Sequence, residues 1–307
     1  MCNKERKGRK LFVEYAVSVL LSGISVGGQY ALIAIGYTMV YGILRLINFA
    51  HGDVFMAAGL IGIYLTASMP LYISLPLVVI LTVVLGFAIE RLAYKPLRTV
   101  PRMSVMISAI GVSYLLQNLA TYITGGQPMT YPNIPMLTKA VTIAGTPTKM
   151  AVLVTPVLVV VLVIALTQLI NHTKIGMGMR AVSKDFETAQ LMGIKINSVI
   201  SATFIVGSAL AAIGSTLYFS CYTAVTPTIG ALPGLKAFVA AVFGGIGSVP
   251  GAVIGAFIIG VCESIIKGLP SAWDVSVFSD AFTFALLIII LVFKPTGLFG
   301  EKTTDKV

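Results

Sequence analysis

Long apolar runs are the feature of this sequence that most restricts its fold. The runs at 73–89, 151–170 and 282–293 approach or reach the roughly 20 residues that a helix needs to cross the hydrocarbon layer of a bilayer. Strands of a transmembrane barrel would instead alternate apolar and polar residues over about ten positions. With 57% hydrophobic and 10% charged residues, the chain has too little polar surface to coat a soluble globule. We therefore expect an all-α, polytopic bundle of transmembrane helices.

Glycine interrupts two of the apolar stretches, one near each end of the chain, at 48–53 and 244–251. Backbone is broken at membrane depth only where protein or a water-filled cavity satisfies the freed amide groups. The two breaks therefore indicate a solute pathway, although tight turns explain the same residues equally well. The candidate lining residues are Asn48, His51, Gly52, Asp53, Gly245, Gly247, Ser248 and Pro250.

The apolar pattern divides the chain into spans within one membrane domain, residues 1–307. The predicted spans lie near residues 12–28, 30–47, 53–69, 71–91, 103–124, 150–171, 198–220 and 281–293 with its flanks. Residues 237–266 are predicted to form two shorter helices around a turn at 248–251. The total is eight to ten spans, some of them broken or re-entrant. Small residues within them, such as Gly207, Gly214 and Gly260, let helices approach closely and slide, or simply pack.

Most of the 21 Lys and Arg residues lie in four short segments, before residue 11, at 91–102, at 174–195 and after residue 293. Such clustering is typical of cytoplasmic connections rather than of a nucleic-acid interface. We therefore expect the N-terminal segment 1–11, the loop 172–198 and the C-terminal segment 294–307 to be cytoplasmic. The loop 125–149 and the segment 268–280 are expected to be external. These features place the protein in a bacterial plasma (inner) membrane.

The basic loop 172–198 has the signals of a short helix. Ser183 is a candidate N-cap, Asp185 and Glu187 favour the positive end of a helix dipole, and Gly193 can close the last turn. Val182, Phe186 and Ala189 fall at i, i+4 and i+7 and predict one apolar face. This face suits a cytoplasmic partner, and a helix lying flat on lipid is the alternative. The candidate coupling residues are Arg180, Ser183, Asp185, Phe186, Glu187, Ala189 and Gly193.

Residue patterns of enzymatic chemistry are missing from the sequence. It contains no Gly-x-x-x-x-Gly-Lys-Ser/Thr phosphate loop, so we expect no ATP site in this chain. His51 and His172 are far apart, and Cys2, Cys221 and Cys262 have no metal-ligand spacing. We therefore expect no catalytic residue, metal, cofactor or disulfide. A secondary transporter, a channel and a membrane scaffold without transport remain alternatives.

Several motifs resemble those of a known family. Glu187, Ala189 and Gly193 are similar to the Glu-Ala-Ala-x-x-x-Gly loop of membrane subunits of ATP-binding cassette importers, with Thr188 in place of the first alanine. The segments 30–42, 47–53, 181–194, 236–256 and 295–300 resemble, in order, those of LivH-type permeases of branched-chain amino acid importers. The resemblance covers essentially the whole chain.

The resemblance implies a transport subunit that depends on partners. LivH-type permeases pair with a LivM-type permease, two cytoplasmic ATPases of the LivG and LivF type, and an external substrate-binding protein. Leucine, isoleucine or valine would move inward by alternating access, and ATP-driven closure of the ATPases would act on the helix near 183–192. Related permeases carry urea, short amides or sugars, so the substrate stays open.

Overall fold

The computed structural model describes residues 2–98, 100–143, 145–269, 275–294 and 296–300. The predicted C-terminal segment beyond Gly300 and the middle of the predicted external segment 268–280 lie outside these residues. The helices are α1 (Cys2–Leu44), α2 (His51–Ser68), α3 (Leu71–Ile89), α4 (Arg102–Thr124), α5 (Pro135–Thr138), α6 (Met150–His172), α7 (Lys174–Lys184), α8 (Phe186–Leu191), α9 (Ile196–Cys221), α10 (Ala231–Gly244), α11 (Val249–Lys267) and α12 (Ser279–Phe293).

Short elements complete the helical bundle. A π-helical turn, η1 (Glu90–Tyr94), and a 3₁₀ turn, η2 (Lys95–Leu97), continue α3, and a second 3₁₀ turn, η4 (Val275–Phe278), precedes α12. Strands β2 (Ala140–Ile143) and β3 (Thr146–Lys149) form an antiparallel hairpin, and β1 (Met129–Thr130) pairs with β4 (Ala224–Val225). The prediction of an all-α bundle is confirmed, with these two small sheets as additions outside the spans.

Seven helices of the described chain are long and apolar enough to cross a membrane. They are Glu14–Leu44 within α1, Leu71–Leu97 from α3 through η2, Met103–Thr124 within α4, α6, α9, α11 and Ser276–Phe293 around α12. The sequence predicts eight to ten spans. The difference arises because the first two predicted spans form one helix and because α2, predicted as a span, starts with the polar residues His51 and Asp53.

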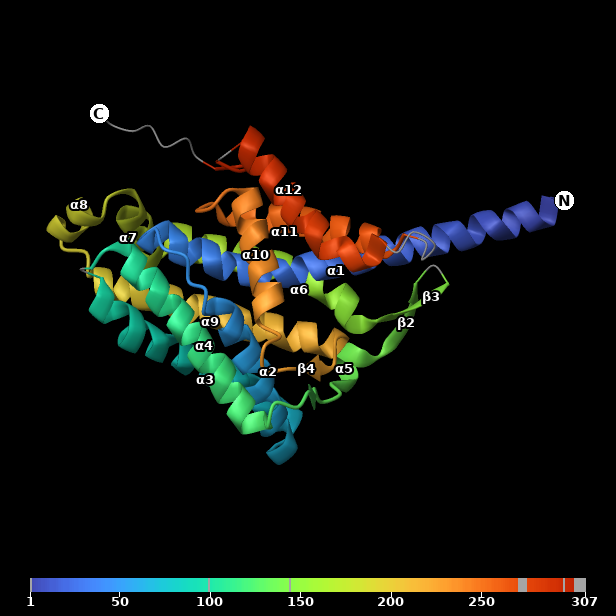
Figure 1. Ribbon diagram of the computed structural model, residues 1–307, viewed down its shortest axis with the longest axis horizontal. Coiled ribbons are helices and arrows are strands. Elements are labelled where there is room, and N and C mark those ends of the chain that lie inside the picture. Colours follow the sequence, from blue (N-terminus) through green and yellow to red (C-terminus); the bar gives the residue numbers. More distant parts are fainter. Residues whose placement is uncertain (1, 99, 144, 270–274, 295, 301–307) are drawn as a thin grey trace.

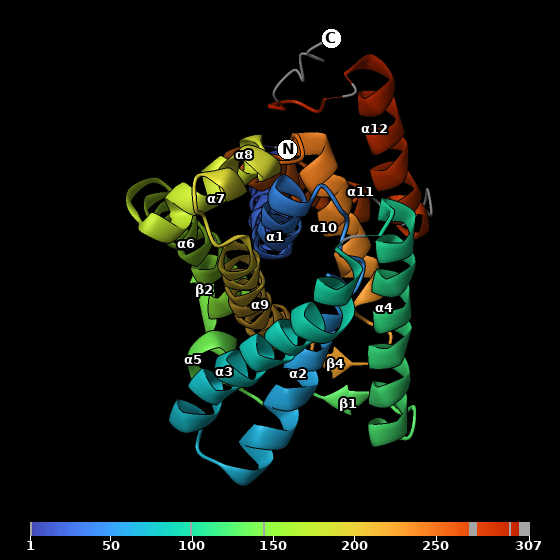
Figure 2. The same ribbon diagram turned by 90° about the vertical axis from the view of Figure 1, so that its left-hand side faces the viewer.

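The continuity of α1 corrects the prediction of two spans at 12–28 and 30–47. Gly27 and Gly28 lie inside the continuous helix. They have no side chains, so neighbouring helices can pack against the backbone of α1. A Cβ atom on Gly27 would lie 2.7 Å from Cα of Phe257, and one on Gly260 would lie 2.2 Å from the backbone nitrogen of Gly27. Small residues permit such close helix crossings in membranes. In Figure 2, α1 lies at the centre of the bundle, and it contacts α6, α9, α10 and α11.

The prediction of two helices in this segment is confirmed by α10 and α11, but the turn between them lies at 245–248 and not at 248–251, because residues 249–251 form the first turn of α11. Gly245 ends α10 with a φ of 109°, a conformation that strongly favours glycine. Ser248 caps α11, because its Oγ accepts a hydrogen bond from the backbone N–H of Gly251 at 3.2 Å. Pro250 occupies the first turn of α11, where a missing N–H costs nothing.

The helix ends gather on two opposite faces of the bundle (Figure 1). The first, which we call the α7–α8 face, carries α7, α8, residues 296–300 and the end of α1, where the Arg45 guanidinium donates a hydrogen bond to the carbonyl oxygen of Ser183 at 3.2 Å. The second, the hairpin face, carries β2, β3 and the start of α1, where a Cβ on Gly145 would lie 2.7 Å from the Glu14 carboxylate. The two ends of α1 therefore lie on opposite faces.

Candidate functional site

The first glycine break, residues 48–53, covers the end of the connection from α1 to α2 and the first turn of α2, and it is largely buried. Asn48 is 3% exposed, and its side-chain oxygen accepts a hydrogen bond from the Tyr94 hydroxyl at 2.5 Å. His51 is also buried, with its ring edge-on to Tyr37 at 5.2 Å between centroids. Its Nε2 atom has no hydrogen-bond partner among the described residues, and it lies so close to Gly36 that a Cβ there would be 2.1 Å away. The break is thus packed into the subunit.

Two further residues of this break hold α2 against its neighbours. A Cβ on Gly52 would lie 2.5 Å from the carbonyl oxygen of Gly230, so the first turn of α2 packs backbone to backbone against the residues that begin α10. The buried Asp53 carboxylate accepts hydrogen bonds from Ser113 at 2.5 Å and from Gln117 at 3.1 Å, both on α4. Hydrogen bonds to a buried carboxylate offset its loss of hydration.

The second break, residues 244–251, lies at the other end of α10, where residues 245–248 connect α10 to α11, and is more exposed. Gly247 has a φ of 98°, and a Cβ built there would meet nothing within 4 Å. Gly247 and Pro250 are exposed, whereas Gly245 is buried against the backbone of Gly300. Of the eight predicted lining residues, these two are the most accessible.

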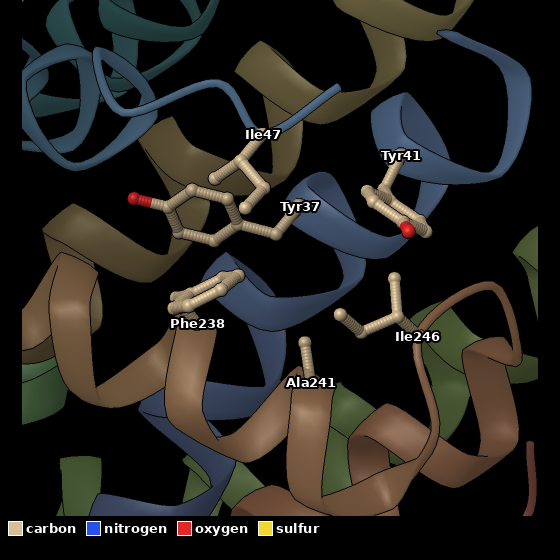
Figure 3. Close-up of a pocket in the computed structure, with 6 residues that line it drawn as sticks. All are labelled: Tyr37, Tyr41, Ile47, Phe238, Ala241 and Ile246. Carbon is tan, nitrogen blue, oxygen red and sulfur yellow. The ribbon is translucent and has the colours of Figure 1, made fainter. Parts of the chain in front are cut away.

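The structure brings the two breaks together beside α10. Ile47, next to the first break, and Ile246 of the second break line a common space with Tyr37 and Tyr41 of α1 and Phe238 and Ala241 of α10 (Figure 3). The space measures about 10 Å³, which is close to the minimum for one water molecule. The two breaks therefore border one small apolar space, and the lining role of the eight candidates stays a prediction.

The loop between α6 and α9 forms two helices, so the prediction of a single helix capped by Ser183 is wrong. Asp185 has an extended backbone, separates α7 from α8 and is the N-cap of α8. Its carboxylate accepts hydrogen bonds from the backbone N–H of Thr188 at 3.0 Å and from its hydroxyl at 2.6 Å. Ser183 lies inside α7 and donates to the carbonyl oxygen of Arg180 at 2.8 Å. Aspartate outcompetes serine here because its two oxygens satisfy two donors.

Gly193 closes α8 as predicted. It has a φ of 81°, its N–H bonds to the carbonyl of Gln190 at 3.0 Å, and the N–H of Ile194 bonds to the carbonyl of Ala189 at 3.1 Å. This pair of bonds is a Schellman motif. The motif gives α8 a defined end.

The predicted apolar face of Val182, Phe186 and Ala189 is wrong, because the extended Asp185 interrupts the helical period. Val182 and Ala189 are buried, whereas 42% of Phe186 is exposed. Leu191 and Met192 are 87% and 78% exposed. We call Phe186, Leu191 and Met192 the α8 patch. Glu187 and Arg180 are also exposed, and Arg180 donates to the carbonyl of Asn171 at 3.2 Å.

Arg45 connects this loop to the first break and was not among the predicted site residues. It is the one non-glycine residue with positive φ, 53°, in the described chain, and such a conformation is uncommon outside glycine. Its hydrogen bond to Ser183 joins the residue that follows α1 to the last turn of α7. The only signal in the sequence was its position beside the break.

Two buried ion pairs were also missed as functional candidates. Glu90 is fully buried and binds Arg98, and it accepts a hydrogen bond from Ser201 of α9 at 2.9 Å. Lys236 of α10 lies 2.7 Å from Glu263 of α11. Glu90 and Glu263 lie near the ends of predicted spans, but both carboxylates are inside the protein. A charge in an apolar run was the available signal.

Comparisons with known proteins identify the family of this chain. The branched-chain amino acid transport system / permease component family matches residues 19–291. The chain is 38% identical to the high-affinity branched-chain amino acid transport system permease protein LivH of Salmonella typhimurium, over 95% of this chain and 98% of that protein. It is 37% identical to LivH of Escherichia coli over the same shares, and 40% identical to BraD of Pseudomonas aeruginosa over 94% and 97%. The chain therefore belongs to the branched-chain amino acid transport system permease family.

Proposed function

We propose that this chain moves leucine, isoleucine or valine into the cell as the permease subunit of an ATP-binding cassette importer. The observation that carries the proposal is its similarity, along nearly the whole chain, to permeases named for branched-chain amino acid transport. A permease of such a system implies ATPase and substrate-binding partners. Their specific identities are a LivM-type permease, ATPases of the LivG and LivF type, and an external binding protein.

The α7–α8 face is the cytoplasmic face in this proposal. Basic residues of the loops on that face support this orientation, because Lys and Arg accumulate in cytoplasmic loops; they include Arg98, Lys174, Arg180, Lys184 and Lys195. The hairpin face is then external. This orientation puts the start of α1 outside, which differs from the expectation from the sequence that both ends of the chain are cytoplasmic.

The α8 patch is the proposed docking surface for an ATPase. Its three apolar side chains are exposed on and just after α8, a short helix that is capped at both ends and lies on the basic face. Exposed apolar groups of this kind, surrounded by polar residues, favour association with a partner. Arg45 would transmit the movement, because its bond to Ser183 connects the docking helices to α1 and to the first break.

Residues of the two breaks are the proposed gate of the pathway. Both breaks flank α10, and the space that Ile47 and Ile246 line in Figure 3 is apolar and nearly closed. A tilt of α10 or α1 would separate Ile47 from Ile246 and open a route there. The exposed Gly247 and Pro250 are then the lining residues at the α7–α8 face, where an imported solute leaves the pathway.

Reconstitution tests the proposal. The chain is assembled with its partner permease and ATPases in proteoliposomes, and leucine uptake is measured with the binding protein present. Uptake that requires both ATP and the partners is expected. Uptake driven by an ion gradient with this chain alone would indicate a secondary transporter, and uptake of urea or a sugar in place of leucine would refute the assigned substrate.

The docking surface has its own test. Leu191→Asp places a charge in the α8 patch and should reduce co-purification of the ATPase subunits by at least tenfold. Met136→Asp is the matched control, because Met136 is 79% exposed on the hairpin face. Equal recovery of the ATPases with both variants would contradict docking at α8.

A further inference from the structure

A cavity of about 420 Å³ lies toward the hairpin face, between the middle of α1, the ends of α9 and α11 and the starts of α10 and α12. Its volume falls within the roughly 300–1,000 Å³ of small-molecule sites. No residue of either glycine break lines it, and no predicted site residue belongs to it. The cavity is therefore separate from the small apolar space that the two breaks border.

Four charged side chains from three helices meet in this cavity. The Nζ atom of Lys236 lies 2.7 Å from Glu263 and 2.6 Å from Asp280, and the Nζ atom of Lys267 lies 2.5 Å from Glu263. The charges balance, two positive against two negative. Lys236 and Glu263 are buried, whereas 41% of the Asp280 side chain and 52% of the Lys267 side chain are exposed. Asp280 is consequently the member of the Lys236–Asp280 pair that can move into solvent.

The remaining lining combines hydroxyl groups with aliphatic side chains. The Tyr30 hydroxyl donates a hydrogen bond to Glu263 at 3.0 Å and fixes that carboxylate against Lys236. Thr226 and Thr228 supply further hydroxyl groups. Val26 and Leu232 supply apolar surface in the same cavity. Such a lining suits a small ligand that is charged at one end and aliphatic at the other.

We propose that this cavity binds a zwitterionic aliphatic amino acid, with the ligand carboxylate on Lys236 and the ligand ammonium on Asp280. A ligand with both charges can replace the Lys236–Asp280 ion pair and leave neither partner unpaired. A ligand with one charge would satisfy only one of the two partners: a carboxylate alone would leave Asp280 without Lys236, and an ammonium alone would leave Lys236 with Glu263 as its one remaining carboxylate partner among the described residues. Glu263 and Tyr30 would hold Lys236 in place throughout. The choice of an aliphatic amino acid rests on the proposed function.

Direct binding tests this site in the assembled importer in lipid nanodiscs, without the binding protein. Tritiated leucine should bind, and unlabelled isoleucine should displace it. Neither 4-methylpentanoate, which lacks the ammonium group, nor 3-methylbutylamine, which lacks the carboxylate, should displace it. Displacement by either singly charged analogue at the concentration effective for isoleucine would overturn the proposal.

Variants locate the site. Asp280→Asn removes the proposed ammonium partner and should weaken leucine binding by about ten- to a hundredfold, as expected for a lost charged hydrogen bond. Glu14→Gln is the matched control, since it removes a carboxylate on the same face outside the cavity, and should leave affinity unchanged. Thr228→Trp fills the cavity without touching the ion pairs and should abolish binding. Wild-type affinity in both Asp280→Asn and Thr228→Trp would overturn the proposal.

Uptake distinguishes this inference from the proposed function. If the complete importer with its binding protein takes up leucine while the nanodisc complex binds none, the cavity proposal fails and the proposed function stands. If no branched-chain amino acid is taken up, the proposed function fails. Leucine binding that depends on Asp280 would still support the cavity as an amino acid site.

Discussion

The crossing of α1 and α11 predicts a large difference between two glycine-to-alanine substitutions. A Cβ on Gly260 would lie 2.2 Å from the nitrogen and 2.4 Å from Cα of Gly27, and 2.7 Å from the carbonyl oxygen of Gly23. All three atoms belong to the backbone of α1 and cannot rotate away. Gly111 on α4 is the matched control, because a Cβ there would meet nothing within 4 Å.

The magnitude follows from two opposing terms. Overpacking costs about 1–3 kcal/mol, and a clash with backbone belongs at the upper end of that range. Alanine recovers about 1 kcal/mol of helix propensity relative to glycine. Gly260→Ala should therefore destabilise the fold by about 2 kcal/mol, whereas Gly111→Ala should be neutral or stabilising.

Thermal unfolding of the purified protein in detergent measures the difference. At about 2–4 °C for each kcal/mol, Gly260→Ala should lower the apparent melting temperature by about 4–8 °C. Gly111→Ala should not lower it. Equal melting temperatures for the two variants would refute the conclusion that glycine at 260 is required by the close approach of α1.

Three further substitutions probe other contacts. Ser248→Ala removes the N-cap of α11 and should cost about 1 kcal/mol; an unchanged melting temperature would count against the cap. Glu90→Ala leaves Arg98 without its buried partner and should cost about 3–5 kcal/mol, measured as the loss of monodisperse protein after solubilisation; full recovery of folded protein would contradict this. Gly193→Val forces a branched residue into left-handed backbone at a cost of about 1–2 kcal/mol and should raise the ATP hydrolysed per leucine transported; an unchanged ratio in proteoliposomes would show that the end of α8 is not needed for coupling.

Glycine residues account both for the helix boundary that the sequence predicted correctly, between α10 and α11, and for the boundary that it predicted wrongly, within α1. The turn between α10 and α11 was predictable, because glycine there accompanies the cap Ser248 and the first-turn proline Pro250. Gly27 carries no such signal, and it serves a helix crossing instead of a turn. A single sequence does not state whether a neighbouring backbone faces a glycine. The requirement for internal hydrogen bonds within the membrane favours the continuous helix.

In the candidate sites, too, the partners of polar and charged residues depend on the tertiary structure and not on the local sequence. Asp185 and Ser183 are both good caps, and only the path of the chain decides that Asp185 begins α8. Lys236 and Glu263 lie 27 positions apart on two helices, so their pairing depends on how α10 packs against α11. The sequence nonetheless predicted the closing role of Gly193 and the location of the exposed loop. Local signals were therefore readable, whereas tertiary pairs were not.

The uninterrupted course of α1 has a mechanical consequence. Its 43 residues form one continuous helical rod about 65 Å long. A displacement imposed at Arg45 would therefore reach the opposite side of the bilayer in full, instead of being absorbed halfway. Inner and outer entrances beside this rod would then have to change in one concerted step, which prevents both from standing open together.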